Sequence, residues 1–316
     1  MPKLMFLISF TLLFSVNCYS QKFIERYYNE NWEAQVNSDF SRFYSISRIT
    51  DSGWYTKDYL LTLNKIQMIG LYEDKENKIR NGCFYWFYPD GKLKTIGKYV
   101  HNLKEGAWLQ FDKDGELEDS SNYKNGNYSG ISLGWYTGGS AKDSINFNKD
   151  GTGLYVSWFD NGQPSAVGRY VNFNLQNGRW KYFHKNGNGS AEELYENGVL
   201  KDKQYFDEKG KPAATAMMDA DATFPGGGKG WSKFLQTQLY FPSNFEFKNG
   251  SVNTIVVSGT INEEGKVIDA EVTVPLHPAF DKIALDAVKN SPLWIPAVSH
   301  NRNVYYHFRQ LVTFSD

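Results

Sequence analysis

A repeat of about 24 residues in the middle of the chain constrains the fold more than any other feature. Each unit begins at a glycine and carries, at fixed offsets, a large aromatic residue, a second glycine and a second aromatic residue. In the unit that begins at Gly82, these are Phe87, Gly91 and Tyr99. A period of this length is typical of stacked units that bury their apolar residues against their neighbours. The five starting residues are Gly82, Gly106, Gly130, Gly153 and Gly178.

Each unit has the pattern of a β-hairpin. The second glycine always follows Asp, Asn or Gly, and such pairs tolerate positive φ at both central positions of a tight turn. A strand of about seven residues fits on either side. We therefore expect an elongated antiparallel sheet of hairpins. Its turns are predicted at Asp90-Gly91, Asp114-Gly115, Gly138-Gly139, Asn161-Gly162 and Asn186-Gly187.

The aromatic residues of the repeat have two interpretations. Their rings can pack against the neighbouring unit and form the core of the array. Alternatively, a subset on one face can remain exposed and contact a carbohydrate or a peptide. The candidate contacts of this repeat face are Trp86, Trp108, Tyr155 and Trp180.

The repeat resembles a known family, the bacterial variant of the MORN repeat. The residues that carry the resemblance are Gly106, Trp108, Phe111 and Gly115, and again Gly178, Trp180, Phe183 and Gly187. The unit from Gly130 departs from the pattern, because Ser132 stands where the first aromatic is expected. The resemblance implies a β-meander that contacts other molecules, and it implies no chemistry.

The first 20 residues have the layout of a secretory signal. Lys3 supplies the positive start, Leu4–Val16 the apolar stretch, and the cleavage site is expected before Gln21. The apolar stretch is shorter than the ~20 residues that span a bilayer, but an uncleaved anchor is the alternative. A lipid on Cys18 is a third option. We expect an exported, periplasmic protein that associates with a membrane peripherally or through a partner.

Composition excludes some classes of protein. The formal net charge is −1, whereas nucleic-acid binding needs clustered positive charge. Removal of the signal leaves Cys83 as the single cysteine, so an internal disulfide is not expected. The predicted organisation is a signal peptide (1–20), an N-terminal cap (21–52), hairpin repeats (53–211), a linker (212–223) and a C-terminal module (224–316).

The C-terminal module shows both helical and strand periodicity. We expect a helix over 231–239, strands over 255–261 and 268–274, a helix from His277-Pro278, and a closing strand over 304–314. This order predicts an α+β layer in which two helices cover one face of a three-stranded antiparallel sheet.

The module is similar to the C-terminal domain of the TonB energy transducers. Several separated motifs carry the similarity: Phe224-Pro225-Gly226-Gly227, Gly265-Lys266-Val267, Phe280-Asp281, Trp294-Ile295-Pro296 and the strand to Phe314. The similarity implies a module that grips a short segment of an outer-membrane transporter. The chain departs from the family in lacking a proline-rich spacer before the module.

The closing strand is the candidate binding site. A strand at the edge of a sheet can accept an extended peptide through its unpaired backbone groups. The alternative is that the array or a second copy covers this edge. The predicted partner-binding residues are Val304, Tyr305, Tyr306, His307, Phe308, Arg309 and Gln310.

No motif in the sequence indicates catalysis. The glycines at 226–230 lack the spacing of a phosphate loop, and Tyr123 stands where a calcium loop from Asp112 needs a glutamate. The five histidines show no metal-ligand spacing, His184 and His300 are expected at the surface, and Cys83 is expected to be packed. We expect a non-enzymatic adaptor without cofactor or metal. The alternatives are an anchored TonB-type energy transducer and an enzyme with a site between the two parts.

Overall fold

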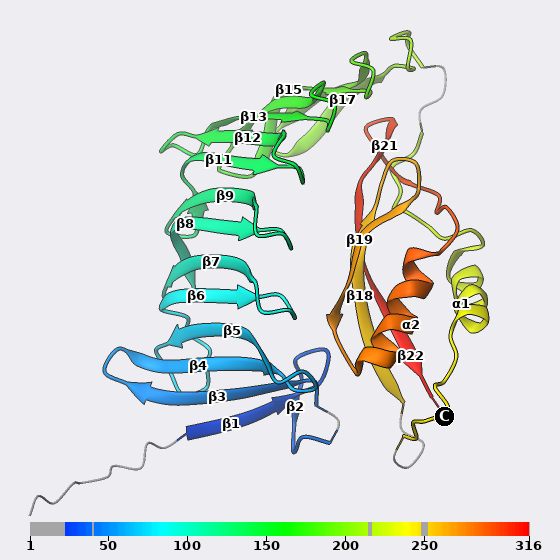
Figure 1. Cartoon of the computed structure of the whole chain (residues 1–316). Helices are drawn as coiled ribbons and strands as arrows, with labels where there is room; N and C mark the ends of the chain where they lie inside the picture. Colours follow the sequence, from blue (N-terminus) through cyan, green and yellow to red (C-terminus); the bar gives the residue numbers. More distant parts are fainter. Residues whose placement is uncertain (1–22, 40, 214–216, 248–251, 316) are drawn as a thin grey trace, which may run out of the picture.

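The protein is described by a computed structural model that covers residues 23–39, 41–213, 217–247 and 252–315. The predicted signal peptide lies outside these residues. Within them, a long antiparallel sheet of hairpins stands beside a small module with two helices and a three-stranded antiparallel sheet (Figure 1). The predicted fold class is confirmed.

The array is a 17-stranded sheet that runs as a meander. Consecutive strands pair antiparallel from β3 to β9 and from β11 to β17, β1 pairs with β2 and β3 at one end, and β9 pairs with β10 and β11 in the middle. The strands are β1 Phe23–Tyr28, β2 Ala34–Gln35, β3 Phe43–Thr50, β4 Gly53–Leu60, β5 Lys65–Tyr72, β6 Gly82–Phe87, β7 Leu93–Val100, β8 Leu103–Phe111, β9 Leu117–Lys124, β10 Asn127–Tyr128, β11 Gly130–Trp135, β12 Ala141–Phe147, β13 Gly153–Trp158, β14 Pro164–Val171, β15 Leu175–Phe183, β16 Gly189–Glu196 and β17 Val199–Tyr205.

The segment before the repeats also forms strands, although its sequence shows no clean period. β1, β2 and β3 belong to the same sheet as the repeats. In β3, Ser45 and Ser47 occupy buried positions, and the Ser47 hydroxyl lies 2.9 Å from the Thr56 hydroxyl. Because these inward residues are polar, the strand lacks the alternation of apolar and polar residues by which strands are recognised.

The turns inside the repeat units differ from the prediction. At the turn of the first unit, Gly91 has positive φ (95°) and Asp90 does not, and the Gly91 N–H donates to the Tyr88 carbonyl at 2.8 Å. The strand register shifts between Trp86 and Phe87. This combination is a three-residue hairpin loop with a glycine bulge, so the expected pair of positive φ angles is wrong here. Three other residues that precede a turn glycine also lack positive φ, namely Asp114, Asn161 and Asn186. The remaining turn follows the prediction, because Gly138 and Gly139 both have positive φ.

Turns with two positive φ angles do occur, at the opposite end of the hairpins. They connect one unit to the next, where the sequence analysis predicted no special turn. Asn and Gly supply these conformations at low cost, since both tolerate the left-handed region. The pairs are His101-Asn102, Asn125-Gly126, Asn172-Phe173 and Asn197-Gly198.

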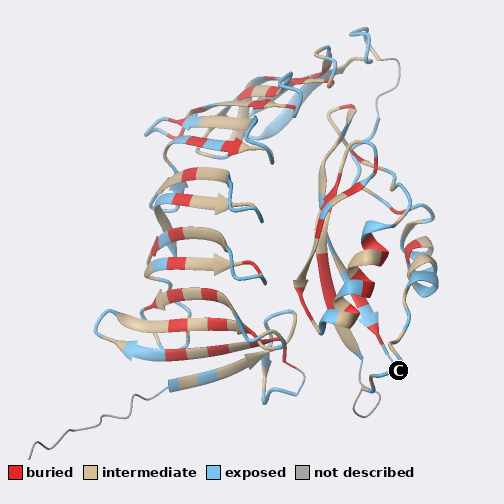
Figure 2. Cartoon of the chain, in the orientation of Figure 1, coloured by how far each residue is buried: buried red, intermediate tan, exposed pale blue. Residues whose placement is uncertain are grey.

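The interior of the array is built from aromatic rings that lie over glycines. A Cβ atom added at Gly97 would lie 2.1 Å from the Trp108 ring, and one added at Gly168 would lie 2.0 Å from the Trp180 ring. Both indoles are buried, and Figure 2 shows such buried positions recurring along the strands. The glycines thus allow the tryptophan of the next unit to pack flat on the backbone.

The C-terminal module confirms the predicted order of its main elements. The sheet has the order β19-β18-β22, and a separate hairpin joins β20 to β21. Helix α2 begins at Pro278, where His277 Nδ1 accepts the N–H of Ala279 at 3.2 Å. The elements are α1 Gly227–Gln238, β18 Asn253–Ile261, β19 Val267–Val274, α2 Pro278–Lys289, β20 Ala297–Ser299, β21 Arg302–Val304 and β22 Tyr306–Phe314. The face of α2 predicted to be apolar is buried at Phe280, Ile283, Ala284, Ala287 and Val288.

The closing strand is shorter than predicted. The chain turns at His300-Asn301, with φ angles of 53° and 61°, and forms the β20–β21 hairpin before β22 begins at Tyr306. Val304 therefore belongs to β21, and Tyr305 lies between the two strands. The prediction of one continuous strand from Val304 is wrong because this local turn was not recognised.

The module packs against the array. Phe43 and Leu60 of the array form a buried cluster with Val256 and Val274 of the module. The hairpin turns of β6–β7 and β8–β9 point toward the module sheet in Figure 1, and Glu271 in β19 forms ion pairs with Lys94 (3.8 Å) and Lys113 (3.4 Å) from this side of the array.

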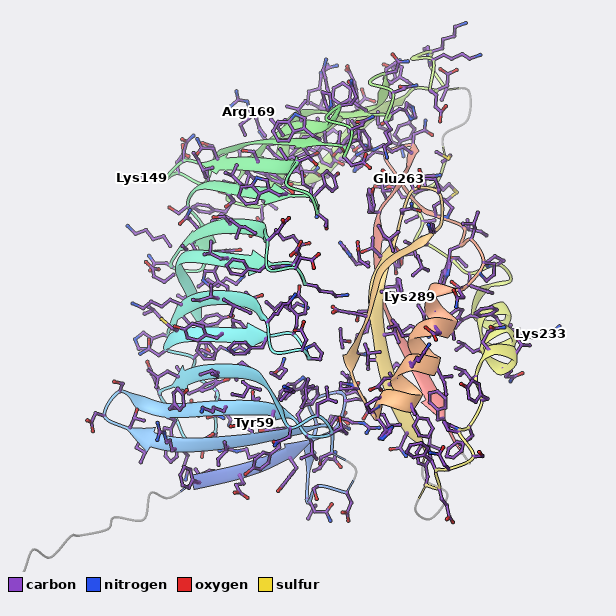
Figure 3. The ribbon with its side chains drawn as sticks, viewed as in Figure 1. Tyr59, Lys149, Arg169, Lys233, Glu263 and Lys289 are labelled. Carbon is purple, nitrogen blue, oxygen red and sulfur yellow. The ribbon has the colours of Figure 1, made fainter. Side chains whose placement is uncertain are left out.

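A second contact joins the far end of the array to the module. Glu263, labelled in Figure 3, lies between β18 and β19 with its carboxylate 4.0 Å from the Lys185 ammonium. The predicted linker also contacts the module, because Ala220 pairs with Val298 and Thr223 with Ile295. Contacts at both ends therefore fix the module along the array.

Candidate interaction surface

Strand β22 lies at one edge of the module sheet. It pairs with β18 along its whole length, from Tyr306 opposite Ile261 to Phe314 opposite Asn253. Within the described ranges, no strand pairs with its other side. An antiparallel edge strand leaves alternate N–H and C=O groups unpaired, so this side can accept a further strand.

The other edge of the sheet, β19, faces the array. Its Glu271 forms the two ion pairs with array lysines, and its Val274 is buried against Phe43 and Leu60. At β22, the described contact with the array is a single hydrogen bond from Arg309 Nη2 to the Glu30 carbonyl at 3.3 Å. The described polar contacts with the array are therefore unequal at the two edges, and no described strand pairs with the outer side of β22.

The side chains of β22 divide between the two faces of the sheet. Tyr306 and Phe308 pack against the helical core cluster, and the Trp294 ring stacks on Phe308 with centroids 6.1 Å apart. His307 and Leu311 lie on the face turned away from the helices, and Leu311 is 44% exposed. A strand added at this edge would thus meet aromatic residues on one face and mixed polar and apolar residues on the other.

Five of the seven predicted partner-binding residues lie on the edge strand β22. Tyr306, His307, Phe308, Arg309 and Gln310 lie on β22. Val304 instead pairs with Ala297, and the Tyr305 ring lies 6.5 Å from the ring of Tyr136 in the array. Tyr305 thus takes part in the contact between module and array, and Val304 belongs to the β20–β21 hairpin.

The predicted repeat-face residues also divide into two groups. Trp108 is 6% exposed and Trp180 is 1% exposed, and their indole N–H groups donate to the carbonyls of Lys98 (3.2 Å) and Arg169 (3.1 Å). Both are core residues, because packing on the glycines beneath them removes them from the surface. They are therefore unavailable as contacts.

Trp86 and Tyr155 are partly exposed and line hollows between the array and the module. Trp86 lines a cavity of about 290 Å³, and Glu271 is another of its lining residues. Tyr155 lines a cavity of about 360 Å³, and His300 and Arg302 are among its other lining residues. These are the members of the predicted set that remain accessible.

His300 is a contact residue that the sequence analysis placed at the surface. Its ring stacks on Tyr182 with centroids 3.5 Å apart and an interplanar angle of 8°. Its Nδ1 lies 3.1 Å from both carboxylate oxygens of Glu193. The pair His300-Asn301 is itself a turn signal that resembles His101-Asn102, so the hairpin could have been predicted from it.

Glu193 is held as a carboxylate by this contact. Burial by itself raises the pKa of Glu193, but hydrogen bonds from His300 and from the Tyr195 hydroxyl (2.6 Å) outweigh burial and lower the pKa below its ordinary value. The pair therefore joins β16 of the array to the β20–β21 hairpin by a hydrogen bond to a charged group.

Two further predictions about single residues are wrong. His184 is buried, with Nε2 3.0 Å from the Phe206 carbonyl, because it lies beneath the last turn of the array. Cys83, expected to be packed, is exposed, because it lies on the face of β6 opposite the buried Phe84.

The described residues contain neither a cluster of metal ligands nor a helix suited to cross a membrane. No group of three or more His, Cys, Asp or Glu residues is arranged there to hold a metal ion. No helix in the described part of the chain is both long enough and apolar enough to cross a membrane.

Comparison with known proteins places one family in the array. The family model described as the MORN repeat variant matches residues 80–101, 104–125 and 176–197. These matches cover β6–β9, β15 and β16 and do not reach the C-terminal module. No curated protein matches the chain. The chain thus carries the MORN repeat variant at three positions, and such repeats suggest a protein-interaction scaffold.

Proposed function

We propose that the protein is a non-enzymatic adaptor of the cell envelope. The array serves as a docking scaffold, and the C-terminal module binds an extended peptide of another envelope protein, for example an outer-membrane transporter. The observation that carries this proposal is the outer edge of the nine-residue strand β22, with which no strand pairs among the described residues. Strand addition at such an edge gives affinity through main-chain hydrogen bonds and selectivity through the flanking side chains.

Two sequence features support a role in the cell envelope. The layout of residues 1–20 is that of an export signal, which agrees with a periplasmic location. The motifs of 224–316 resemble the TonB C-terminal domain, a module that grips a short segment of a transporter. The proposed function needs no cofactor and no nucleic acid.

Site-specific photo-crosslinking tests the proposal. A photoreactive residue in place of Leu311 on β22 is expected to form a crosslink with an envelope protein in intact cells. Leu200 on β17 is the matched control, because it also lies on the last strand of its sheet and is 41% exposed, against 44% for Leu311. The adduct should map to an extended segment of the partner.

Two outcomes would contradict the proposal. One is the absence of any adduct from Leu311 when the protein is folded and exported. The other is the same set of adducts from Leu311 and Leu200, since this would show random proximity instead of recognition at β22.

A second candidate is an energy transducer anchored by an uncleaved N-terminal segment. It is favoured by the TonB resemblance and by the apolar stretch Leu4–Val16. N-terminal sequencing of the purified protein separates the two functions. A mature start at Gln21 supports the adaptor, and a start at Met1 with retention in the inner membrane supports the transducer.

A further inference from the structure

A small polar cavity lies where the β20–β21 hairpin meets the far half of the array. Its volume is about 360 Å³, and its walls come from β12 to β15 on one side and from His300 and Arg302 on the other. Ligand sites usually measure roughly 300–1,000 Å³, so this cavity suits a ligand of one or two rings. It is distinct from the β22 edge.

Asp143 in the cavity wall is a carboxylate that lacks a partner. Among the described residues, it forms neither a hydrogen bond nor an ion pair within 4.0 Å. Burial raises the pKa of Asp143, and the charges of Lys142 and Asp119 act on this pKa in opposite directions. Partly buried carboxylates normally receive hydrogen bonds, so Asp143 is a site at which a ligand donor would be stabilised.

The preceding repeat unit shows why Asp143 is unpaired. Asp119 occupies the same repeat position and accepts a hydrogen bond from Ser121 Oγ at 2.8 Å. The residue equivalent to Ser121 in the next unit is Ile145, which cannot donate. Among the described residues, Asp119 thus has a hydrogen-bond donor and lies outside the cavity, whereas Asp143 lacks a donor and lies in the cavity wall.

The other walls hold their polar groups in fixed positions. Arg302 Nη1 donates to Ser165 Oγ (3.0 Å) and to the Phe183 carbonyl (2.8 Å), and Gln176 Nε2 donates to the Tyr182 hydroxyl (2.8 Å). Tyr155 adds a partly exposed aromatic ring. The cavity thus combines a ring face with preorganised hydrogen-bonding groups.

The charges around the cavity favour a neutral ligand. A cationic ligand would be repelled by Arg302 and Lys142, and an anionic one by Asp143 and Glu193. A polyhydroxylated ring can donate to a carboxylate, accept from amides and lay its C–H face on an aromatic ring. We propose that this cavity binds a mono- or disaccharide, with sugar hydroxyls donating to Asp143 and the sugar ring lying against Tyr155.

Titration of the full chain with three disaccharides tests the proposal. Cellobiose, maltose and the disaccharide of N-acetylglucosamine are the probes, and isothermal calorimetry together with tryptophan fluorescence is the readout, because Trp158 and Trp180 line the cavity. We expect saturable binding of at least one probe. Asp143→Asn should weaken it about tenfold, since the charged carboxylate acceptor is replaced by a neutral amide oxygen that accepts more weakly. Asp119→Asn, the matched variant, should weaken binding much less, because Asp119 acts on Asp143 only through its charge.

The result that would overturn the proposal is the absence of saturable binding by all three probes. Equal weakening in the two variants would also overturn it, because it would place the effect outside the cavity. Putrescine is titrated in parallel, and binding of this diamine without sugar binding would show that Asp143 serves a cation site instead. Thermal unfolding of each variant checks that the fold is retained.

Discussion

At the scale of single residues, glycines decide how the units of the array stack. Gly97 and Gly168 allow indole rings to lie within van der Waals contact of the backbone. Gly97→Ala should destabilise the protein by at least about 2 kcal/mol, because the added methyl group would overlap the Trp108 ring. Urea unfolding of the full chain measures the change.

Gly189→Ala is the matched control for this prediction. Gly189 also lies in a strand of the array, but the atom nearest to an added Cβ would be 4.0 Å away, on the Phe206 ring. This variant should change the free energy of unfolding by less than about 1 kcal/mol. Equal destabilisation by both substitutions would show that the indole contact is not the cause.

A buried aspartate in the array makes stability depend on pH. Burial raises the pKa of Asp58 to about 6, while Ser45 and Arg26 act in the opposite direction. Because this pKa is higher in the folded state than the ~3.9 of an unfolded chain, folding favours the protonated form. The contribution of Asp58 to stability is therefore largest below about pH 4 and is lost as pH rises through about 6, a cost of about 3 kcal/mol.

Asp58→Asn should remove this pH dependence. We expect the free energy of unfolding at neutral pH to rise, by up to about 3 kcal/mol, and its slope between about pH 4 and pH 6 to flatten. Asp221→Asn, at an exposed position, is the control and should retain the slope. A decrease in stability at neutral pH on replacing Asp58 would mean that the charged form is favoured in the folded state.

At the scale of elements, the β20–β21 hairpin fastens the module to the far end of the array. His300 contacts Glu193 and Tyr182, and Asn301 Nδ2 donates to the Phe206 carbonyl at 2.9 Å. His300→Ala should cost about 1–3 kcal/mol, since the buried Glu193 carboxylate would keep the Tyr195 hydroxyl but lose its hydrogen bond to His300. The backbone amides of β16 should then exchange hydrogen faster.

His101 gives a close control for His300. Both histidines begin a turn with positive φ, 46° and 53°, both precede an asparagine, and both contact a glutamate. The side chain of His101 is 69% exposed, however, so His101→Ala should cost less than about 1 kcal/mol. A larger loss at His101 than at His300 would contradict the role given to the hairpin.

The contact between Glu193 and His300 predicts that the stability of the protein decreases in acid. The pKa of Glu193 is lower in the folded state than in an unfolded chain, so its contribution to stability is present above the ordinary pKa of about 4.3 and is lost as pH falls below it. Glu193→Gln should reduce stability at neutral pH and flatten the acid limb of the stability curve. An unchanged acid limb would show that the pair does not contribute.

The sequence predicted elements well where one period dominated. The repeat strands, helix α2 and the β18–β19 pair follow from aromatic spacing, a helical stripe and alternation. β3 was missed because its buried positions at Ser45 and Ser47 are polar. The β20–β21 hairpin was missed because three-residue strands carry too little periodicity, and its only signal is the turn pair His300-Asn301.

The candidate sites were less predictable than the fold. Tyr306 to Gln310 could be assigned to an edge strand from the order of elements, which fixes which strand comes last. The cavity at Asp143 could not be predicted, because it depends on contacts between array strands and a hairpin that lies more than 100 residues later in the chain. Burial of Trp108 and Trp180 depends on Gly97 and Gly168, a repeat feature that becomes informative only when strand pairing is known.

At the scale of the whole molecule, the array contacts the module in such a way that one edge of its sheet has no neighbouring strand among the described residues. Glu271 in β19 pairs with two array lysines, and β22 is the end strand at the other side of the three-stranded sheet. This arrangement is compatible with the proposed peptide binding, since no described strand pairs with the side of β22 that lies opposite β18.

Hydrogen–deuterium exchange of the full chain, with and without the partner segment identified by crosslinking at Leu311, tests this claim most directly. Strand addition predicts that amide exchange slows across 306–314, while exchange across 199–205 in the terminal strand of the array stays the same. Slower exchange elsewhere, with no change across 306–314, would show that the partner binds another surface and would contradict the account.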